Sequence, residues 1–70
     1  MTNKLEFQAE VRGDLIVVTE PASRFIAVYS KPAGQPQLIL KQRTETDDHE
    51  ILAGAWQAAN VKAREAGWIV

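Results

Sequence analysis

The chain has 70 residues, of which 46% are hydrophobic and 24% are charged, and its formal net charge is -1. This composition is typical of a globular protein, and the length predicts a single domain spanning residues 1–70. A net charge near zero argues against a general nucleic-acid binder, and the absence of cysteine excludes disulfides and cysteine-based metal sites. At this size folding hides only about 60% of the surface of the chain, so we expect oligomerisation to add support.

The beginning of the chain has no feature of a membrane or export segment. Residues 1–6 contain one lysine, after which apolar and polar side chains alternate, and no apolar run approaches the roughly 18 residues of a membrane span. The apolar core of a signal peptide is also missing. We therefore expect a cytoplasmic protein with no membrane association.

Four strands are predicted, at residues 5–11, 15–19, 25–30 and 37–42. The first alternates apolar and polar side chains, which is typical of a strand with one face in water. Gly13-Asp14 then suits a two-residue type II′ hairpin turn, because glycine comes first. Pro21 favours a second turn, and the proline and glycine residues between 31 and 36 predict a loop.

A C-terminal helix is predicted from Thr46 or Asp47 to Ala66. Asp47, with Glu50 three residues later, fits a capping box, and Gly67 suits the position after the last turn. One stripe of this helix is apolar: Ile51, Leu52, Ala55, Ala59, Ala63 and Ala66. The predicted fold is α+β, an antiparallel β-meander of three to four strands with one C-terminal helix packed on one face, in the order ββββα.

The predicted strands carry more apolar surface than one helix can cover. The alternation assigns one set of side chains to the helix side: Leu15, Val17, Phe25, Ala27, Tyr29, Leu38 and Leu40. Five β-branched residues are then predicted on the opposite face: Ile16, Val18, Ile26, Val28 and Ile39. An exposed patch of this size usually marks a contact surface. Three covers are open: a second copy of the chain, a different protein, or the tail Trp68–Val70 folding over. Sheet twist or a different register would instead place some of these residues on the helix side.

Two short motifs have structural explanations that suffice. Arg12-Gly13-Asp14 is the tripeptide of integrin-binding proteins, but it falls at the predicted hairpin turn. Asp47-Asp48-His49-Glu50 joins the single histidine to three carboxylates, yet neighbours in one helical turn diverge, and acidic residues favour a helix start. An enzyme using His49 with Asp48 or Glu50 is the hypothesis we place last. We predict no catalytic residue, no metal site and no cofactor.

The leading hypothesis is a non-enzymatic interaction or structural module that self-associates, as a homodimer, through the sheet face opposite the helix. Trp56 and Trp68 are candidate partner contacts, because tryptophan is enriched at binding hot spots. The alternative is a nucleic-acid-contacting accessory or antitoxin-like domain, for which the candidate residues are Lys31, Lys41 and Arg43. Strands followed by a helix resemble the double-stranded-RNA-binding-like fold of some antitoxins in element order alone.

Overall fold

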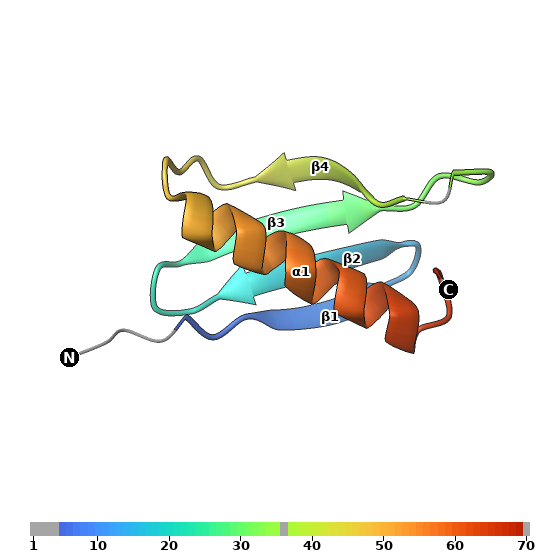
Figure 1. Cartoon of the computed structure of the whole chain (residues 1–70), viewed down its shortest axis with the longest axis horizontal. Coiled ribbons are helices and arrows are strands. Elements are labelled where there is room, and N and C mark those ends of the chain that lie inside the picture. The colour runs from blue at the N-terminus through green and yellow to red at the C-terminus, as the bar shows by residue number, and fades with distance from the viewer. Residues whose placement is uncertain (1–4, 36, 70) are drawn as a thin grey trace.

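A computed structural model describes residues 5–35 and 37–69 of the chain. It contains β1 (Gln8–Arg12), β2 (Leu15–Glu20), β3 (Phe25–Ser30), β4 (Ile39–Arg43) and α1 (His49–Glu65). The four strands form one antiparallel sheet in the order β1-β2-β3-β4, and α1 lies across one face of it (Figure 1). The predicted α+β meander with one C-terminal helix is therefore confirmed.

Both hairpins before β4 are tight. Arg12 pairs with Leu15 across the first turn, and Gly13 has a φ of +61°, as the predicted type II′ turn requires. In the second turn the backbone N–H of Arg24 donates to the carbonyl oxygen of Pro21 over 3.3 Å. Arg24 has a φ of +58°, a left-handed conformation that is unfavourable for a residue with a Cβ.

The fourth strand is irregular and exposed. Tyr29 pairs with Leu40 but Val28 pairs with Gln42, so Lys41 is an extra residue that forms a β-bulge. All five residues of β4 are exposed. Within the described residues α1 contacts β1, β2 and β3 but not β4 (Figure 1). Both faces of β4 are therefore open to solvent.

The helix begins one or two residues later than the sequence predicts. The N-cap is Asp48, whose Oδ1 accepts hydrogen bonds from the backbone N–H groups of Glu50 at 2.9 Å and Ile51 at 3.3 Å. The predictions of a start at Thr46 or Asp47 and of a capping box between Asp47 and Glu50 are wrong. Thr46 instead accepts a hydrogen bond from the backbone N–H of Asp48 over 3.1 Å, which fixes the entry into the cap.

The helix ends in a Schellman motif around Gly67, which has a φ of +78°. The backbone N–H of Trp68 donates to the carbonyl oxygen of Ala63 at 2.8 Å, and that of Gly67 donates to Arg64 at 3.1 Å. The C-cap is Ala66, the residue at which the sequence predicts the end of the helix. Trp68 and Ile69 leave the helix and pack, half-buried, against the core.

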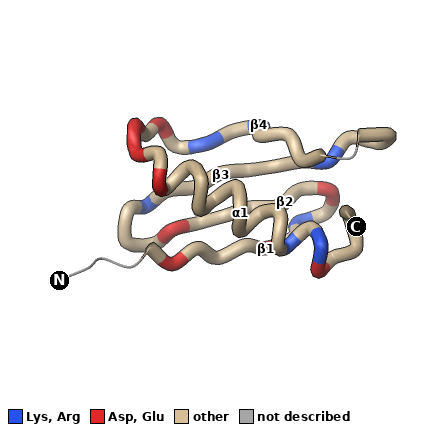
Figure 2. Tube along the Cα trace, in the orientation of Figure 1, with Lys and Arg blue, Asp and Glu red and all other residues tan. Residues whose placement is uncertain are grey.

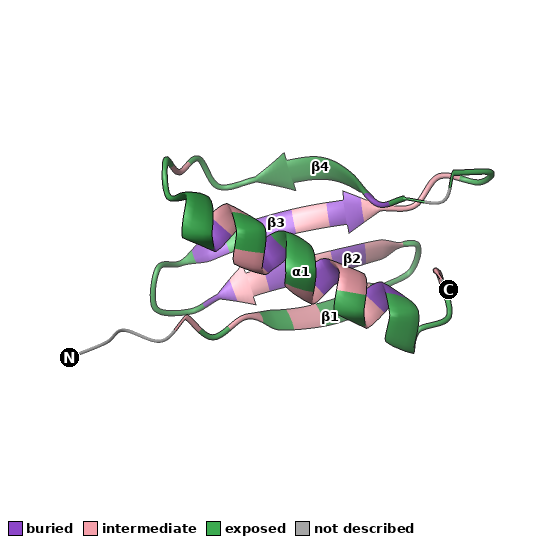
Figure 3. Ribbon diagram, viewed as in Figure 1, coloured by how far each residue is buried: buried purple, intermediate pink, exposed green. Residues whose placement is uncertain are grey.

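The core lies between α1 and the first three strands (Figure 3). Its buried residues are Ile16, Val18, Phe25, Ala27, Tyr29, Leu38, Ile51, Ala55, Ala59 and Ala63. Three of the four buried helix residues are alanines, and these small side chains let α1 approach the sheet closely. Gly54 continues this approach, because a Cβ placed there would overlap the ring of Phe7.

The sidedness predicted for β2 is wrong. Ile16 and Val18 have no exposed surface and lie beneath α1, whereas the alternation in the sequence predicts them on the opposite face. Because the first hairpin turn has only two residues, Val11 pairs with Ile16, and cross-strand partners share a face. Leu15 and Val17 are consequently the residues of β2 that face away from α1. A shift of one residue exchanges the two faces of a strand.

Candidate interaction surface

The sheet face opposite α1, here called the open face, carries five aliphatic side chains: Leu15, Val17, Ile26, Val28 and Ile39. The structure thus supports the predicted positions of Ile26, Val28 and Ile39 and replaces Ile16 and Val18 with Leu15 and Val17. Val17 and Val28 are direct cross-strand partners at the centre of the sheet. Ile26 and Ile39 are 49% and 44% exposed, so within the described residues no element covers this face.

Polar residues surround the aliphatic centre of the open face. On β1 the Nε of Arg12 lies 3.2 Å from Oε1 of Glu10, and these two side chains neutralise one another. At the opposite side, Thr44 closes the edge through two hydrogen bonds with Ile26, from its backbone N–H at 2.8 Å and to its hydroxyl at 3.1 Å. A shallow hollow of about 390 Å³ lies there, beside Val28. An apolar centre with a polar rim is the usual anatomy of a protein interface.

The described part of the C-terminal tail does not cover the open face. Trp68 and Ile69 pack against the core, which lies on the helix side of the sheet. Val70 lies outside the described residues. Trp68 also lines a small hollow with Asp14 and Lys31 at one end of the sheet. The predicted role of Trp68 as a partner contact stays a prediction, and its placement explains it as packing at the rim of the core.

Trp56, the other candidate partner contact, lies on the helix side of the sheet. It is 41% exposed, and its ring packs against the ring of Tyr29 with centroids 5.8 Å apart and a tilt of 57°. Burial raises the pKa of Tyr29, although the positive charge of Arg43 opposes this. Trp56 therefore covers part of the Tyr29 ring on the helix side of the sheet.

The candidate nucleic-acid residues are spread along β3 and β4. Lys31 follows the last residue of β3, whereas Arg43 pairs with Ala27 near its beginning. Lys41 lies between them in the bulge of β4. The aromatic side chain nearest to them in the sheet, Tyr29, is buried and so has no face free for stacking on a base. No described feature unites these residues into one basic surface.

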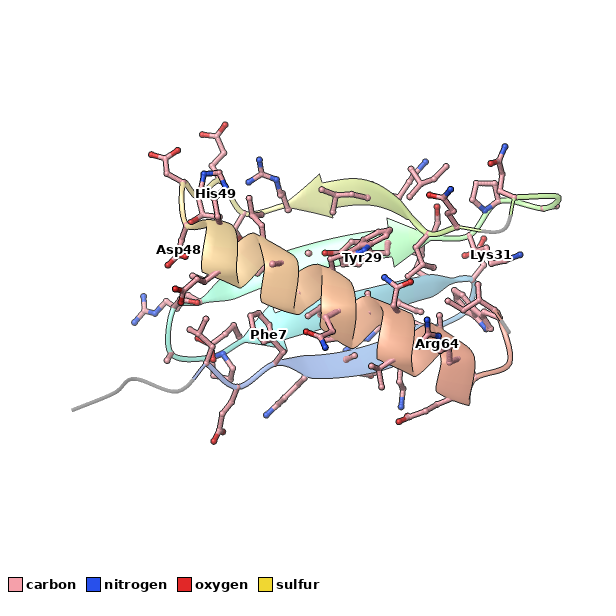
Figure 4. The ribbon with its side chains drawn as sticks, in the orientation of Figure 1. Phe7, Tyr29, Lys31, Asp48, His49 and Arg64 are labelled. Atoms are coloured by element: carbon pink, nitrogen blue, oxygen red, sulfur yellow. The ribbon has the colours of Figure 1, made fainter. Side chains whose placement is uncertain are left out.

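The acidic cluster at the start of α1 has a structural role. Figure 2 groups acidic residues there, and Figure 4 places His49 and Asp48 side by side at the helix start. The carboxylate of Asp48 is committed to the N-cap. Across residues 5–35 and 37–69, no three histidine, aspartate or glutamate side chains are placed to hold a metal ion. All four residues of the cluster, 47–50, are exposed.

A buried carboxylate, which sequence reasoning missed, organises the second hairpin. Oε1 of Glu20 accepts hydrogen bonds from the backbone N–H and the hydroxyl of Ser23, both at 3.0 Å, and Oε2 accepts one from the backbone N–H of Glu6 at 3.1 Å. The signal available was position: Glu20 has the parity of Ile16 and Val18 in β2, and it precedes a Pro-containing turn. These hydrogen bonds tie the last residue of β2 to the turn that follows it and to the segment before β1.

Comparison with protein-family models, with curated proteins and with solved structures finds no significant match to this chain. Within the described residues, no helix combines the length and the apolar character needed to cross a bilayer.

Proposed function

We propose that the chain is a non-enzymatic interaction module that self-associates by packing its open face against the open face of a second copy. The observation that carries this proposal is the set of five aliphatic side chains on a sheet face that no described element covers. A 70-residue domain without disulfides has little stability to spare, and a partner that buries this face would add to it. The two functions, contact and stabilisation, would then share one surface.

A second copy suits this face better than a strongly charged partner does. The aliphatic centre bears no charge, and the charged pair at its rim, Glu10 and Arg12, contains both signs. Two copies with a net charge of -1 each repel one another little. Two sheets would pack face to face about 10 Å apart, with their strands about 30° from alignment, and with α1 outermost on each side. Such a contact is isologous and closes on itself.

Two neighbouring residues of β4 provide a matched test. Ile39 lies on the open face and is 44% exposed, while Leu40 lies on the helix side and is 42% exposed. We expect Ile39→Glu to lower the molar mass measured by size-exclusion chromatography with light scattering, because it places a charge in the contact. Leu40→Glu adds the same charge at equal exposure and should leave the mass unchanged.

The controls for this pair are the far-ultraviolet circular dichroism spectrum and the melting temperature, which show that both variants stay folded. An equal molar mass for the two variants would contradict the proposal, whether both keep the mass of the unaltered chain or both show a lower mass. A lower molar mass for Leu40→Glu alone would place the contact on the helix side instead.

A further inference from the structure

We propose a second contact of different geometry: the free edge of β1 pairs with β1 of another copy, antiparallel, and joins two four-stranded sheets into one sheet of eight strands. This contact uses the edge of the sheet and the groove beside it, not the open face. It therefore holds whether or not the open faces pack against one another. Its support comes from the backbone, from the groove and from the charges of β1.

Among residues 5–35 and 37–69, nothing pairs with the outer edge of β1, and its backbone leaves hydrogen-bonding groups free there. In a two-residue hairpin the flanking residues, here Arg12 and Leu15, exchange the backbone hydrogen bonds nearest to the turn. Alternation along the strand then turns the N–H and C=O groups of Ala9 and Val11 outward. The backbone N–H of Glu6 agrees with this parity, because it points inward to the carboxylate at the end of β2. Such an edge is a template for another strand.

The two edges of the sheet differ in how they are protected. The pairing of β4 is interrupted by a bulge, and the extra residue there is Lys41; bulges and lysines are devices that discourage strand addition. The pairing of β1 with β2 runs over five residues with no shift in register. The edge of β1 is therefore the one that can accept a strand over its full length.

A groove runs along β1 on the helix side. Two adjoining hollows, of about 520 Å³ and 280 Å³, share Ala9, Lys62 and Glu65 as lining residues. The remaining walls are mostly apolar, and they are Phe7, Val11, Ala58, Val61 and Ala66 with Glu10 at one end. Val61 is 47% exposed in this groove, and Lys62 and Glu65 form its outer rim with 3.7 Å between Nζ and Oε1.

These walls define the chemistry of the strand that fits. Its side chains on the groove side must be apolar and mostly small, because they meet Val61 and the methyl group of Ala58. Its side chains on the other face must be polar, because they lie beside Glu10 and Arg12. The strand β1 itself has this pattern, with Ala9 and Val11 on the groove side and polar residues between them. The surface is therefore self-complementary, as a two-fold contact requires.

Charge selects the register of the pairing. With Glu10 on the two-fold axis, two identical carboxylates would lie directly opposite one another, which is destabilising. With Ala9 on the axis, Glu6 of each copy lies opposite Arg12 of the other, and seven residues of each strand overlap. Figure 1 shows α1 crossing the sheet diagonally, so that only its last turns reach the edge of β1. In this register the C-terminal end of each α1 would lie beside the start of the other copy's β1, near Phe7. At that point the other copy's α1 lies farther from the edge of the sheet, so the two helices have room.

The test uses Ile39→Glu as the starting protein, because that change disables the open-face contact. Ala9→Pro removes an outward N–H at the edge and leaves the ladder between β1 and β2 intact, since proline is tolerated on edge strands. We expect Ile39→Glu alone to sediment as two copies, and Ile39→Glu with Ala9→Pro to show a dissociation constant raised about tenfold or more. A circular dichroism melt of each protein verifies folding.

Charge reversal gives a second arm that does not depend on proline. In the same Ile39→Glu protein, Arg12→Glu should weaken the pairing by placing a carboxylate opposite Glu6 of the other copy. Adding Glu6→Arg should restore the dissociation constant, because the pair is then reversed in sign. Rescue is the result that a merely local disturbance of the strand would not produce.

Three results would overturn the edge pairing. The first is sedimentation of Ile39→Glu as single chains at millimolar concentration, which would leave the open-face proposal standing. The second is a dissociation constant that Ala9→Pro leaves unchanged. The third is a dissociation constant that stays raised when Glu6→Arg is added to Arg12→Glu. If the unaltered chain forms an assembly that Ile39→Glu leaves intact but Ala9→Pro dissociates, the open-face proposal fails and the edge pairing holds.

Discussion

Glu20 is a buried carboxylate that links the β2–β3 turn to the segment before β1. Burial by itself raises its pKa, but hydrogen bonds from Glu6, from the backbone and hydroxyl of Ser23, and from Ala22 outweigh that effect, so the pKa lies below its usual value of 4.5. The ionised form is thus the one that the fold prefers. Its contribution to stability is fully present above pH 4.5 and is lost as the pH falls through the lowered pKa.

The prediction from Glu20 is a change in the pH dependence of stability. Glu20→Gln should lower the melting temperature at neutral pH, and it should flatten the loss of stability as the pH falls below about 5. The matched control is Glu45→Gln, because Glu45 is exposed and lies in a loop. Thermal unfolding followed by circular dichroism across this range measures both. Parallel curves for the unaltered chain and Glu20→Gln would contradict the role given to this carboxylate.

Arg24 occupies a left-handed conformation that costs a residue with a Cβ about 1–2 kcal/mol. Glycine adopts this conformation without strain but loses more entropy on folding. We therefore expect Arg24→Gly to raise the free energy of unfolding by about 0.5–1 kcal/mol, measured by urea denaturation. Arg24→Ala removes the same side chain but keeps the Cβ, and it should give no gain. A gain from both variants would show that the arginine side chain, not the backbone, is unfavourable.

At the scale of elements, the order of strands and helix follows from periodicity and from turn residues. Gly13 and Gly67 are both at positive φ, where the sequence predicts a type II′ turn and a helix end. The facing of β2 could not be predicted from its own residues, because Leu15 to Val18 are all aliphatic and carry no alternation. The two-residue turn determines which residues of β2 face α1, because it sets β2 in register with β1, whose side chains alternate.

The helix start was missed for a similar reason. Thr46, Asp47 and Asp48 are all good N-cap residues, so composition alone does not choose among them. The structure has Asp48 at the N-cap, and Ile51 and Ala55 are buried on the face of α1 that packs against the sheet. The groove beside β1 could not be predicted at all, since the angle at which a helix crosses a sheet is not encoded in the period of its apolar residues.

The contact between Gly54 and Phe7 couples α1 to the segment before β1. An alanine in mid-helix is favoured over glycine by about 1 kcal/mol, but here its Cβ would displace the Phe7 ring. We expect Gly54→Ala to destabilise the chain by about 1 kcal/mol. In a Phe7→Ala background the same substitution should stabilise it by about 0.5–1 kcal/mol. A double-mutant cycle in urea measures the coupling, and an effect of the same sign in both backgrounds would contradict it.

At the scale of the molecule, the fold has two layers, a helix and a sheet, and the helix covers only one face of the sheet. Correcting the facing of β2 exchanges Ile16 and Val18 for Leu15 and Val17, and it leaves the number of aliphatic residues on the open face at five. The sequence therefore predicts an uncovered aliphatic face correctly, although two of the five residues predicted on it are wrong. The excess of aliphatic residues over what one helix can shelter is a property of the whole sheet and does not depend on register.

The two proposed contacts are compatible with one closed assembly. Edge pairing through β1 would make eight-stranded sheets with both helices on one side, and the open faces of two such sheets could then stack back to back. Four copies related by perpendicular two-fold axes form a closed tetramer, one of the common symmetries of soluble proteins. Loss of the open-face contact alone would leave edge-paired dimers, and loss of the edge alone would leave face-paired dimers.

Sedimentation equilibrium of the unaltered chain, from micromolar to millimolar concentration, tests the central claim most directly. One chain has a mass of 7.8 kDa. Burial of the open face against a second copy predicts a mass that rises with concentration to at least twice that value. A mass that stays at 7.8 kDa throughout the range would contradict self-association through either surface.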